Sequence, residues 1–521
     1  MEPHLRTLDA LAILLYLAGM VAIALYFARR NTNTEEYFVG NRGFAGWVIG
    51  LSMLGTIVSS ATFLALPAAA YALDWRQLAV NFAVPLVAVL AVVFFIPLFR
   101  RGRMTSAFEY LGLRYGPIPR LYGTVSFIIL QVIRTAQVLF LVALPVQFLT
   151  GASLEATIIG TGVFVACYTV VGGIDTVIWT DVVQTIVMIV GGVVCAGYVV
   201  VALPQGLDQI IEVGSAADKF SLGSFDWDLT RRTFWTVLLL GIVNWLAIYG
   251  GDQNIVQRYV SSRSTREARK ATILYSVLAL PMWAFFFFVG TSVFVYYQTF
   301  PTEDVQKLAV DQILPYFILT RIPAGMAGLI VAAIIAAAMS TLDSSINAIA
   351  TVSVVDLLKP FLARDRSDRY YLWAARMIAT GAAVLMIMGA LTFARISKES
   401  MNDISLIVTS VFGGCLMGLF MVGIFTRRVD GFAANCALAA AVVFNVYLAL
   451  GAFEILPQSW RLRAHEYWVG ALVNGCFVLV AYIVALLRRR PPLNLRGLTV
   501  WTTRLRDEPV RMGVSCETEP Y

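Results

Sequence analysis

Charged residues, histidines and paired cysteines are scarce in this chain. Only 14% of its 521 residues are Asp, Glu, Lys or Arg, whereas soluble domains carry about a quarter. Its two histidines, His4 and His465, lie outside the long apolar runs, and none of the six cysteines belongs to a Cys-x-x-Cys pair. With no His-Glu-x-x-His motif and no nucleophile beside a base, we expect neither an enzyme nor a zinc or copper site. The cysteines are expected to be reduced packing residues.

Long apolar runs dominate what is present. Hydrophobic residues make up 59% of the sequence, and the mean hydropathy is +0.77. Runs of roughly 20 residues, long enough to cross a bilayer core, recur from near Leu8 to near Leu487. They predict an all-α polytopic membrane protein with about thirteen transmembrane helices. The expected spans are 8–28, 45–73, 77–99, 121–149, 155–172, 177–202, 234–257, 271–298, 314–346, 371–394, 402–425, 431–453 and 466–488.

The net charge of +7 is divided among short basic clusters between these runs. A nucleic-acid-binding protein would place such an excess on one continuous face, so we expect the lipid bilayer and not nucleic acid as the partner. If the N-terminus lies outside, the positive-inside rule places all the main clusters in the cytoplasm. We therefore expect a protein of the cell (inner) membrane with a retained first span and a cytoplasmic C-terminus. The clusters are at 29–42, 100–120, 258–270, 359–369, 427–428 and 488–496.

Two of the apolar runs are interrupted by polar and helix-breaking residues. Run 45–73 contains glycines and hydroxyl residues before Pro67, and run 234–257 ends in a crowded polar stretch. Such interruptions are tolerated where they line a cavity, and their separation by about five spans matches two inverted repeats of five helices with broken first helices. We expect a single transmembrane domain over residues 1–490. It consists of a leading helix (8–28), a ten-helix core (45–425) and two C-terminal helices (431–488), and a cytoplasmic tail (491–521) follows.

The stretch from Ala337 to Asn347 carries hydroxyls and a carboxylate inside an apolar run. On a helix, Ser340, Asp343 and Ser344 share one face. This oxygen-only set of donors suits a hard monovalent cation. The alternative is a packing seam of small residues with interhelical hydrogen bonds, although a seam does not need a carboxylate.

Two further charges lie inside apolar runs, where charged side chains are costly and usually functional. Arg134 is a candidate fork for the carboxylate of a substrate. The alternatives are a structural pair with a protein carboxylate and an arginine that snorkels near one membrane face. Asp181 follows Gly172-Gly173, which marks a sharp connection between spans. It is either a carboxylate favoured near a helix N-terminus or a cation ligand.

Polar side chains also gather near the first interruption. The hydroxyls there bond either to their own helix backbone or to a solute, and two amides on the next span are candidates for further contacts. The hydroxyl residues are Thr56, Ser59, Ser60 and Thr62, and the amides are Gln77 and Asn81.

Four segments, in this order, resemble the sodium/solute symporter family: Glu36–Arg42, Gly172–Gln184, Gln253–Tyr259 and Ala337–Asn347. The resemblance covers most of residues 8–425. It implies a leucine-transporter-like core of five plus five inverted helices, in which the first and sixth are broken.

The same resemblance implies a principal sodium site between the first and eighth core helices. Its ligands in this chain would be the carbonyls of Gly55, Val58 and Ala337 and the hydroxyls of Ser340 and Thr341. A second sodium site would use Asp181, Ser340, Asp343 and Ser344. Asp343 departs from the serine common at that position in related members.

Among subfamilies, the chain looks most like the bacterial sialic acid symporters. The likeness rests on Ser59–Phe63, Asp74-Trp75 and Arg134. It implies that Arg134 clamps a carboxylate, while Ser59 and Thr62 contact that carboxylate or nearby hydroxyls. Asn81 stands where those transporters have glutamine, and Ile57 stands where they have threonine.

The expected function is sodium-coupled import of a small carboxylate-bearing organic solute by alternating access, the solute being sialic acid or a related sugar acid. The alternative is a sodium- or proton-coupled symporter for a sugar, an amino acid such as proline, or a monocarboxylate. We expect no organic cofactor, sodium as the coupling ion and the only metal, and transport by a single chain with the oligomeric state open.

Overall fold

The computed structural model describes residues 6–28, 33–228, 231, 233–396, 413–452, 455–462, 468–488, 495 and 497–502. Within these ranges every regular element is a helix, and the only other pairing is an isolated backbone bridge between Phe44 and Ser262. The predicted all-α class is therefore confirmed.

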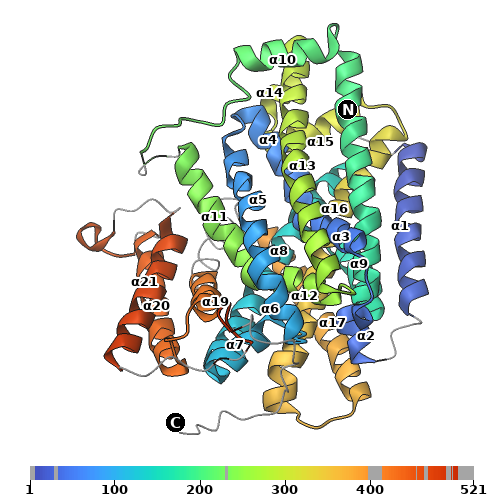
Figure 1. Cartoon of the computed structure of the whole chain (residues 1–521). Helices are drawn as coiled ribbons and strands as arrows, with labels where there is room; N and C mark the ends of the chain where they lie inside the picture. The colour runs from blue at the N-terminus through green and yellow to red at the C-terminus, as the bar shows by residue number, and fades with distance from the viewer. Residues whose placement is uncertain are drawn as a thin grey trace.

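Figure 1 shows the helices running roughly parallel to one long direction. In chain order they are α1 (Thr7–Ala28), α2 (Thr34–Val39), η1 (Gly40–Arg42), α3 (Gly46–Ile57), α4 (Ser60–Ala72), η2 (Arg76–Phe82), α5 (Ala83–Leu90), η3 (Ala91–Phe95), α6 (Ile96–Arg101), α7 (Ala107–Tyr115), α8 (Pro117–Thr150), α9 (Leu154–Ala202), α10 (Gly206–Ala216), α11 (Phe234–Gly251), α12 (Gln253–Ser261), α13 (Thr265–Thr299), α14 (Glu303–Lys307), α15 (Val310–Arg321), α16 (Met326–Val352), η4 (Ser353–Leu362), α17 (Asp368–Phe393), α19 (Leu416–Phe425), α20 (Gly431–Ala452), η5 (Gln458–Trp460) and α21 (Val469–Leu487).

Ten helices of the described chain are long and apolar enough to cross a membrane, or up to eleven if the bent pair α3 and α4 forms one span. The predicted count of about thirteen is not confirmed. One reason is α9, which is counted as one span although it has 49 residues. A straight helix of that length would measure about 74 Å. Gly173 breaks α9 with φ 57° and ψ −164°, which an L-residue rarely adopts. The sharp connection predicted at Gly172-Gly173 is present.

The predicted span 314–346 has wrong boundaries. The structure ends α15 at Arg321 and starts α16 only at Met326. Pro323 and Gly325, the latter with φ 86°, separate the two helices because neither residue favours continuation of a helix. Helix α16 then runs to Val352 and places residues 337–347 in its middle.

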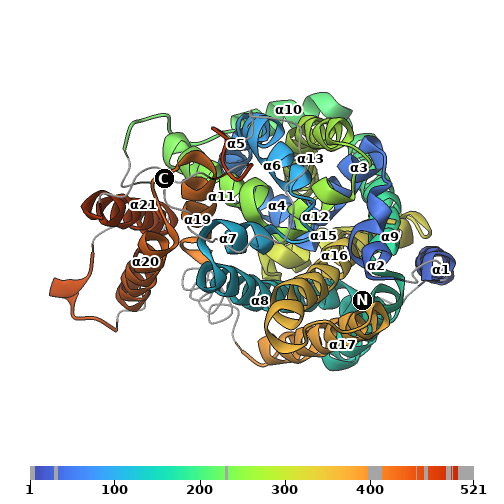
Figure 2. The ribbon, with the colours of Figure 1, turned by 60° about the horizontal axis from the view of Figure 1, so that its bottom comes forward.

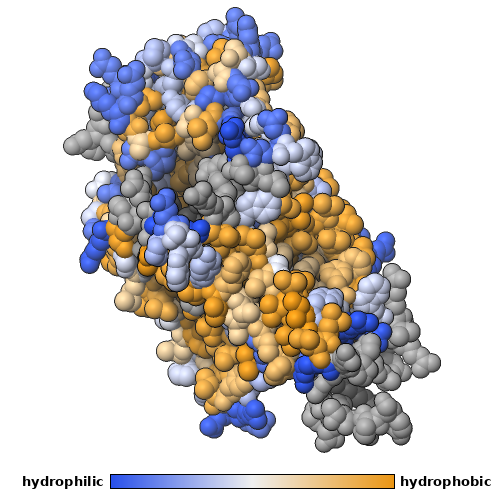
Figure 3. Space-filling model, turned by 90° about the vertical axis from the view of Figure 1, so that its left-hand side faces the viewer, coloured by the Kyte–Doolittle hydropathy of each residue, from blue (hydrophilic) through white to orange (hydrophobic). Residues whose placement is uncertain are grey.

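The molecule has an apolar girdle between two polar ends (Figure 3). We call the end that carries α10 and α14 the α10 end, and the opposite end, with α2 and α7, the α7 end (Figure 1). Seen from the α7 end, α20 and α21 lie to one side of the other helices, and α1 lies on the opposite side (Figure 2). Helix α1 packs against α9 and α16.

Helix α16 is the centre of the core. It packs against α9, α8, α1, α17, α4 and α3, and nearly all its residues are buried. A helix that is apolar on every face and surrounded by other helices belongs in the interior. The hydroxyls and the carboxylate of this helix are consequently enclosed by protein and not by lipid.

Candidate cation and solute sites

The first interrupted span breaks between α3 and α4. Val58 and Ser59 have extended backbone, with ψ of 102° and 178°. The last helical bond of α3 runs from the Val58 N–H to the Leu54 carbonyl, at 2.9 Å. Carbonyl groups in the last turn of a helix have no partner within it, so the break presents backbone oxygens inside the molecule.

Helix α16 meets this break. A Cβ added at Gly55 would lie 3.0 Å from Ser340 Oγ, so the missing side chain lets the two backbones approach. The Thr341 hydroxyl lies 3.4 Å from the Thr56 carbonyl and 3.5 Å from the Ala337 carbonyl. The structure thus gathers Gly55, Ala337, Ser340 and Thr341, and the buried Val58 lies on the same break.

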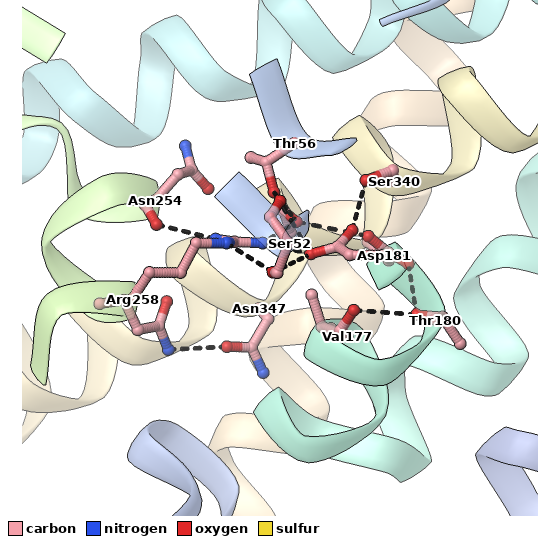
Figure 4. A network of polar contacts seen from close by, with 12 residues as sticks. Ser52, Thr56, Val177, Thr180, Asp181, Asn254, Arg258, Ser340 and Asn347 are labelled. Atoms are coloured by element: carbon pink, nitrogen blue, oxygen red, sulfur yellow. Dashed lines mark hydrogen bonds and ion pairs between the residues drawn. The ribbon is translucent and has the colours of Figure 1, made fainter. Parts of the chain in front are cut away.

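Asp181 lies beside these residues in a buried network (Figure 4). Its Oδ2 accepts from Arg258 Nη2 at 2.6 Å, from Ser52 Oγ at 2.5 Å and from Thr56 Oγ1 at 3.3 Å. Its Oδ1 accepts from the Ser340 hydroxyl. Both carboxylate oxygens are therefore engaged by protein groups.

Arg258 was not among the residues predicted to be functional. It lies on α12 just beyond the predicted end of span 234–257, and its side chain is only 1% exposed. The second broken helix explains this position, because α11 ends at Gly251 and α12 continues after Asp252. Its Nη1 donates to the Asn254 carbonyl at 2.8 Å, and its Nη2 donates to Ser344 Oγ at 2.7 Å. The sequence signal was an arginine in a polar stretch directly after a broken span.

Asp343 faces a different set of groups. Tyr168, on the first part of α9, donates its hydroxyl to Asp343 Oδ2 at 2.8 Å, and Thr180 Oγ1 lies 3.4 Å from the same oxygen. Ser344 Oγ is 3.5 Å from Asp343 Oδ1 and 3.2 Å from Thr56 Oγ1. Asp343 forms no ion pair within the described part of the chain.

Arg134 lies in the middle of α8 and is half-buried. Its guanidinium makes no hydrogen bond or ion pair with any residue that the structure describes. Asp252, at the second helix break, is close enough to attract it electrostatically, but the two do not form an ion pair. A guanidinium always carries its charge, so this side chain is available to an anion.

The other predicted solute contacts are less closely grouped. Ser59 and Thr62 are buried at the break, whereas Gln77 is exposed and Asn81 is half-buried on η2. Helix η2 packs against α11 and α13. No hydrogen bond among the described residues joins these four side chains to Arg134.

A cavity of about 680 Å³ opens between α4, α8 and α15. Its α8 wall includes Leu141 and Phe148, and its α4 wall includes Ser60. Arg134 and Leu141 are seven residues apart, which places them on the same face of α8 and about 10 Å apart along its axis. The cavity thus lies about two helical turns from Arg134. Gly151 and Ala152, which follow α8, also line it.

Hydrogen bonds to main-chain carbonyls hold segments together at the α7 end. Phe44 donates its N–H to the Ser261 carbonyl at 3.2 Å and accepts from the Arg263 N–H at 2.9 Å. Gln257 Nε2 donates to the Phe38 carbonyl at 2.7 Å. Arg100 Nη1 donates to the Tyr259 carbonyl at 2.8 Å. The segments before α3 and at the end of α12 are therefore joined directly.

The sequence model of the sodium:solute symporter family matches residues 37–443, which is most of the chain. The chain belongs to the sodium:solute symporter family. It is 32% identical over 487 residues to the sodium/sialic acid symporter NanT of Aliivibrio fischeri (strain ATCC 700601 / ES114), covering 92% of this chain and 93% of that one. It is 31% identical to the sodium/sialic acid symporter SiaT of Proteus mirabilis (strain HI4320), over 82% of this chain and 86% of that one.

A solved structure shares the fold of this symporter. It is the substrate-bound, outward-open state of a Na⁺-coupled sialic acid symporter, with a TM-score of 0.85, 27% identity and coverage of 94% of this chain and 99% of that chain. The predicted family, the inverted-repeat fold class and the expectation of a transporter and not an enzyme are confirmed. The symporter is a multi-pass membrane protein whose coupling ion is sodium.

Proposed function

We propose that this symporter imports sialic acid or a related sugar acid together with sodium. The observation that carries the proposal is Arg134, a half-buried guanidinium without a protein partner among the described residues. It lies about two helical turns along α8 from a cavity of about 680 Å³. A planar guanidinium binds a carboxylate through two parallel hydrogen bonds. The relatives NanT and SiaT are both named as sodium/sialic acid symporters.

The size and lining of the cavity agree with a solute of this kind. Small-molecule sites usually enclose about 300–1,000 Å³ and combine apolar walls with a few polar groups. Here Leu141 and Phe148 supply apolar surface, and Ser60 supplies a hydroxyl. We assign Ser59 and Thr62, on the helix break, to the carboxylate or to nearby hydroxyls, and Asn81 and Gln77 to the outer part of the solute.

The principal sodium ion is assigned to the contact between the α3–α4 break and α16. Its ligands are the carbonyls of Gly55, Val58 and Ala337 and the hydroxyls of Ser340 and Thr341. The Thr341 hydroxyl already lies 3.4 Å from a carbonyl of the break, and neutral oxygens suit a hard cation. An ion held there binds the broken helix to α16.

A second sodium ion is assigned to the neighbouring acidic groups, with Asp181, Ser340, Asp343 and Ser344 as the candidate ligands. These residues are all buried within one network. Two carboxylates in a low-dielectric interior favour bound cations.

The α7 end is assigned to the cytoplasm. Basic residues stand at helix ends that we assign to this side: Arg100-Arg101 end α6, Arg269-Lys270 lie near the start of α13, and Arg488 follows α21. The positive-inside rule expects such residues in the cytoplasm. The chain then begins outside, ends in the cytoplasm and occupies the cell (inner) membrane, and the cavity opens outward while Phe44 and Ser261 keep the inner side closed. Sodium and solute bind in this state, and the exchange of gates releases them inside.

The test is uptake and binding by the purified chain, which we expect to suffice without a partner subunit. N-acetylneuraminic acid should raise the melting temperature in NaCl, and its methyl ester, which lacks the carboxylate, should not. Arg134→Ala should abolish the shift, and Arg134→Lys, which keeps the charge without the planar fork, should weaken it. All variants should keep the melting shift that sodium alone produces, which shows that they are folded.

Two results would oppose this assignment. Equal binding of the acid and its ester would remove the carboxylate clamp from Arg134. Uptake that persists when choline replaces sodium at constant pH would favour the proton-coupled alternative.

A further inference from the structure

A second polar cluster lies next to the Asp181 network, where α9, α16 and α1 meet. It consists of Asp343 on α16, Tyr168, Thr180 and Gln184 on α9, and Tyr16 on α1. Asp343 and Thr180 are 0% exposed, Gln184 is 1% exposed and Tyr168 is 4% exposed. Tyr16 is half-buried. The four residues on α9 and α16 are therefore enclosed by protein.

The charges around Asp343 do not balance. Among the described residues, the charged groups that face it are Asp181 and Arg258, and the phenols of Tyr168 and Tyr16 are also near. Arg258 is paired with Asp181 at 2.6 Å, so one guanidinium stands against two carboxylates. With both aspartates ionised the interior carries one excess negative charge, and an unpaired charge in such a place is costly.

The two carboxylates are not equally free to accept a cation. Asp181 accepts from the side chains of Arg258, Ser52, Thr56 and Ser340. Asp343 accepts one strong hydrogen bond, from Tyr168 at 2.8 Å, while its contacts with Thr180 and Ser344 are 3.4 and 3.5 Å. Because a metal ion must displace or share existing donors, Asp343 is the more accessible ligand.

The amide of Gln184 points to a missing ligand. It lies near the hydroxyls of Tyr16 and Tyr168, yet neither its Oε1 nor its Nε2 makes a hydrogen bond of normal geometry with any described residue. Buried polar atoms in native proteins nearly always have a partner. Thr176, Thr180 and Gln184 follow one another at intervals of one helical turn. The buried hydroxyl of Thr176 also has no partner among the described residues. One face of α9 therefore offers oxygens that no group in the described part of the chain satisfies.

We propose that a sodium ion binds between Asp343 and Gln184, with the hydroxyl oxygens of Tyr168 and Thr180 as further ligands and Tyr16 at the edge. All donors are oxygens, as a hard cation requires. One monovalent ion neutralises the excess charge, whereas a divalent ion would reverse it. This inference rests on the proposed function and moves the second coupling ion from Asp181 to the α9 side of Asp343.

The location gives the leading helix a part in ion binding. Tyr16 lies on α1, outside the ten-helix core, and its hydroxyl is 3.6 Å from Met339 Sδ on α16. An ion beside Asp343 would therefore draw together α1, α9 and α16. Removing the hydroxyl of Tyr16 should weaken ion binding less than a change at Gln184, because Tyr16 only borders the site.

The test is equilibrium binding of ²²Na⁺ to the full chain in lipid nanodiscs, with choline chloride holding the ionic strength constant. Gln184→Leu and Tyr168→Phe should raise the half-saturating sodium concentration of one binding event about tenfold or more. Asp343→Asn should lower the number of sodium ions bound per chain by one. Tyr37→Phe is the matched control, because Tyr37 is also a buried tyrosine with one hydrogen bond, to the Val170 carbonyl at 3.1 Å, and should bind sodium normally.

The outcomes separate this inference from the proposed function. If Gln184→Leu, Tyr168→Phe and Asp343→Asn bind sodium as Tyr37→Phe does, the inference fails and the principal site stands. If the unaltered chain binds no sodium in the same assay, the proposed function itself fails. Gln184→Leu keeps the result interpretable if Asp343→Asn does not fold, since it changes no charge.

Discussion

Arg258 Nη2 lies 2.6 Å from Asp181 Oδ2, and the two side chains are 1% and 0% exposed. This ion pair joins α12, which follows the second helix break, to α9. Ser52 of α3 contacts both partners, donating to Asp181 at 2.5 Å and accepting from Arg258 Nε at 2.8 Å. The two broken spans are therefore connected through one buried pair beside the candidate sodium sites.

Removing one partner of this pair should be more harmful than removing both. Arg258→Met leaves a buried carboxylate without its counter-charge, and such a change costs about 3–5 kcal/mol. The double variant Arg258→Met with Asp181→Asn should recover part of that loss because no unpaired charge remains. Thermal unfolding in detergent measures the effect, and strictly additive losses would mean that the two residues are not energetically coupled.

The principal sodium site should depend on the hydroxyls of α16. Ser340→Ala together with Thr341→Val removes two candidate oxygens with little change in volume, and the sodium concentration for half-maximal uptake should rise about tenfold or more. Ser292→Ala is the control. Within the described part of the chain, that buried hydroxyl bonds only to its own helix, at the Phe288 carbonyl at 2.7 Å. An unchanged sodium dependence in the double variant would place the ion elsewhere.

Helix α1 should stabilise α16 through Asp9. The buried Asp9 Oδ1 accepts from the N–H groups of Gly325 and Gly328, at 2.8 and 2.7 Å, and so caps α16 from another helix. Asp9→Ala should lower stability by about 2 kcal/mol or more, because buried donors are left unsatisfied. Asp9→Asn keeps an acceptor and should cost less. Equal melting temperatures for the two variants would argue against the cap.

Lys219 should make stability depend on alkaline pH. Its Nζ donates to the carbonyls of Tyr71 and Leu73, at 2.7 and 3.0 Å, and lies 4.1 Å from the centre of the Phe294 ring. Burial lowers the pKa of Lys219 below its usual 10.5, and the nearby Asp74 partly offsets this effect. The unfolded chain then binds more protons than the folded chain between the two pKa values.

The contribution of Lys219 to stability should therefore rise with pH as the pH approaches 10.5 from below. Lys219→Met removes the titrating group and should flatten that part of the profile. The measurement is the difference in melting temperature between the two proteins from neutral to alkaline pH. A difference that is constant with pH would show that the charge of Lys219 is not penalised.

Much of the architecture could be predicted from local properties of the sequence. Apolar runs predicted the membrane helices, and polar interruptions predicted both broken spans. Both signals lie in contiguous residues, because a span crosses the bilayer, and a helix breaks, within one segment of the chain. Arg134 and the Ser340–Ser344 stretch were recognisable because polar groups within apolar runs are conspicuous. The start of α16 was missed because hydropathy alone does not register the break at Pro323 and Gly325.

By itself the sequence determined the all-α membrane fold, the two broken helices and the oxygen-rich face of α16, since each depends on composition and period within one segment. Only the tertiary structure decided which groups meet. Arg258 pairs with Asp181, 77 residues away, and Tyr168 bonds to Asp343, 175 residues away. Such partners depend on how each helix is rotated and shifted against its neighbours, and that is set by packing of the whole bundle.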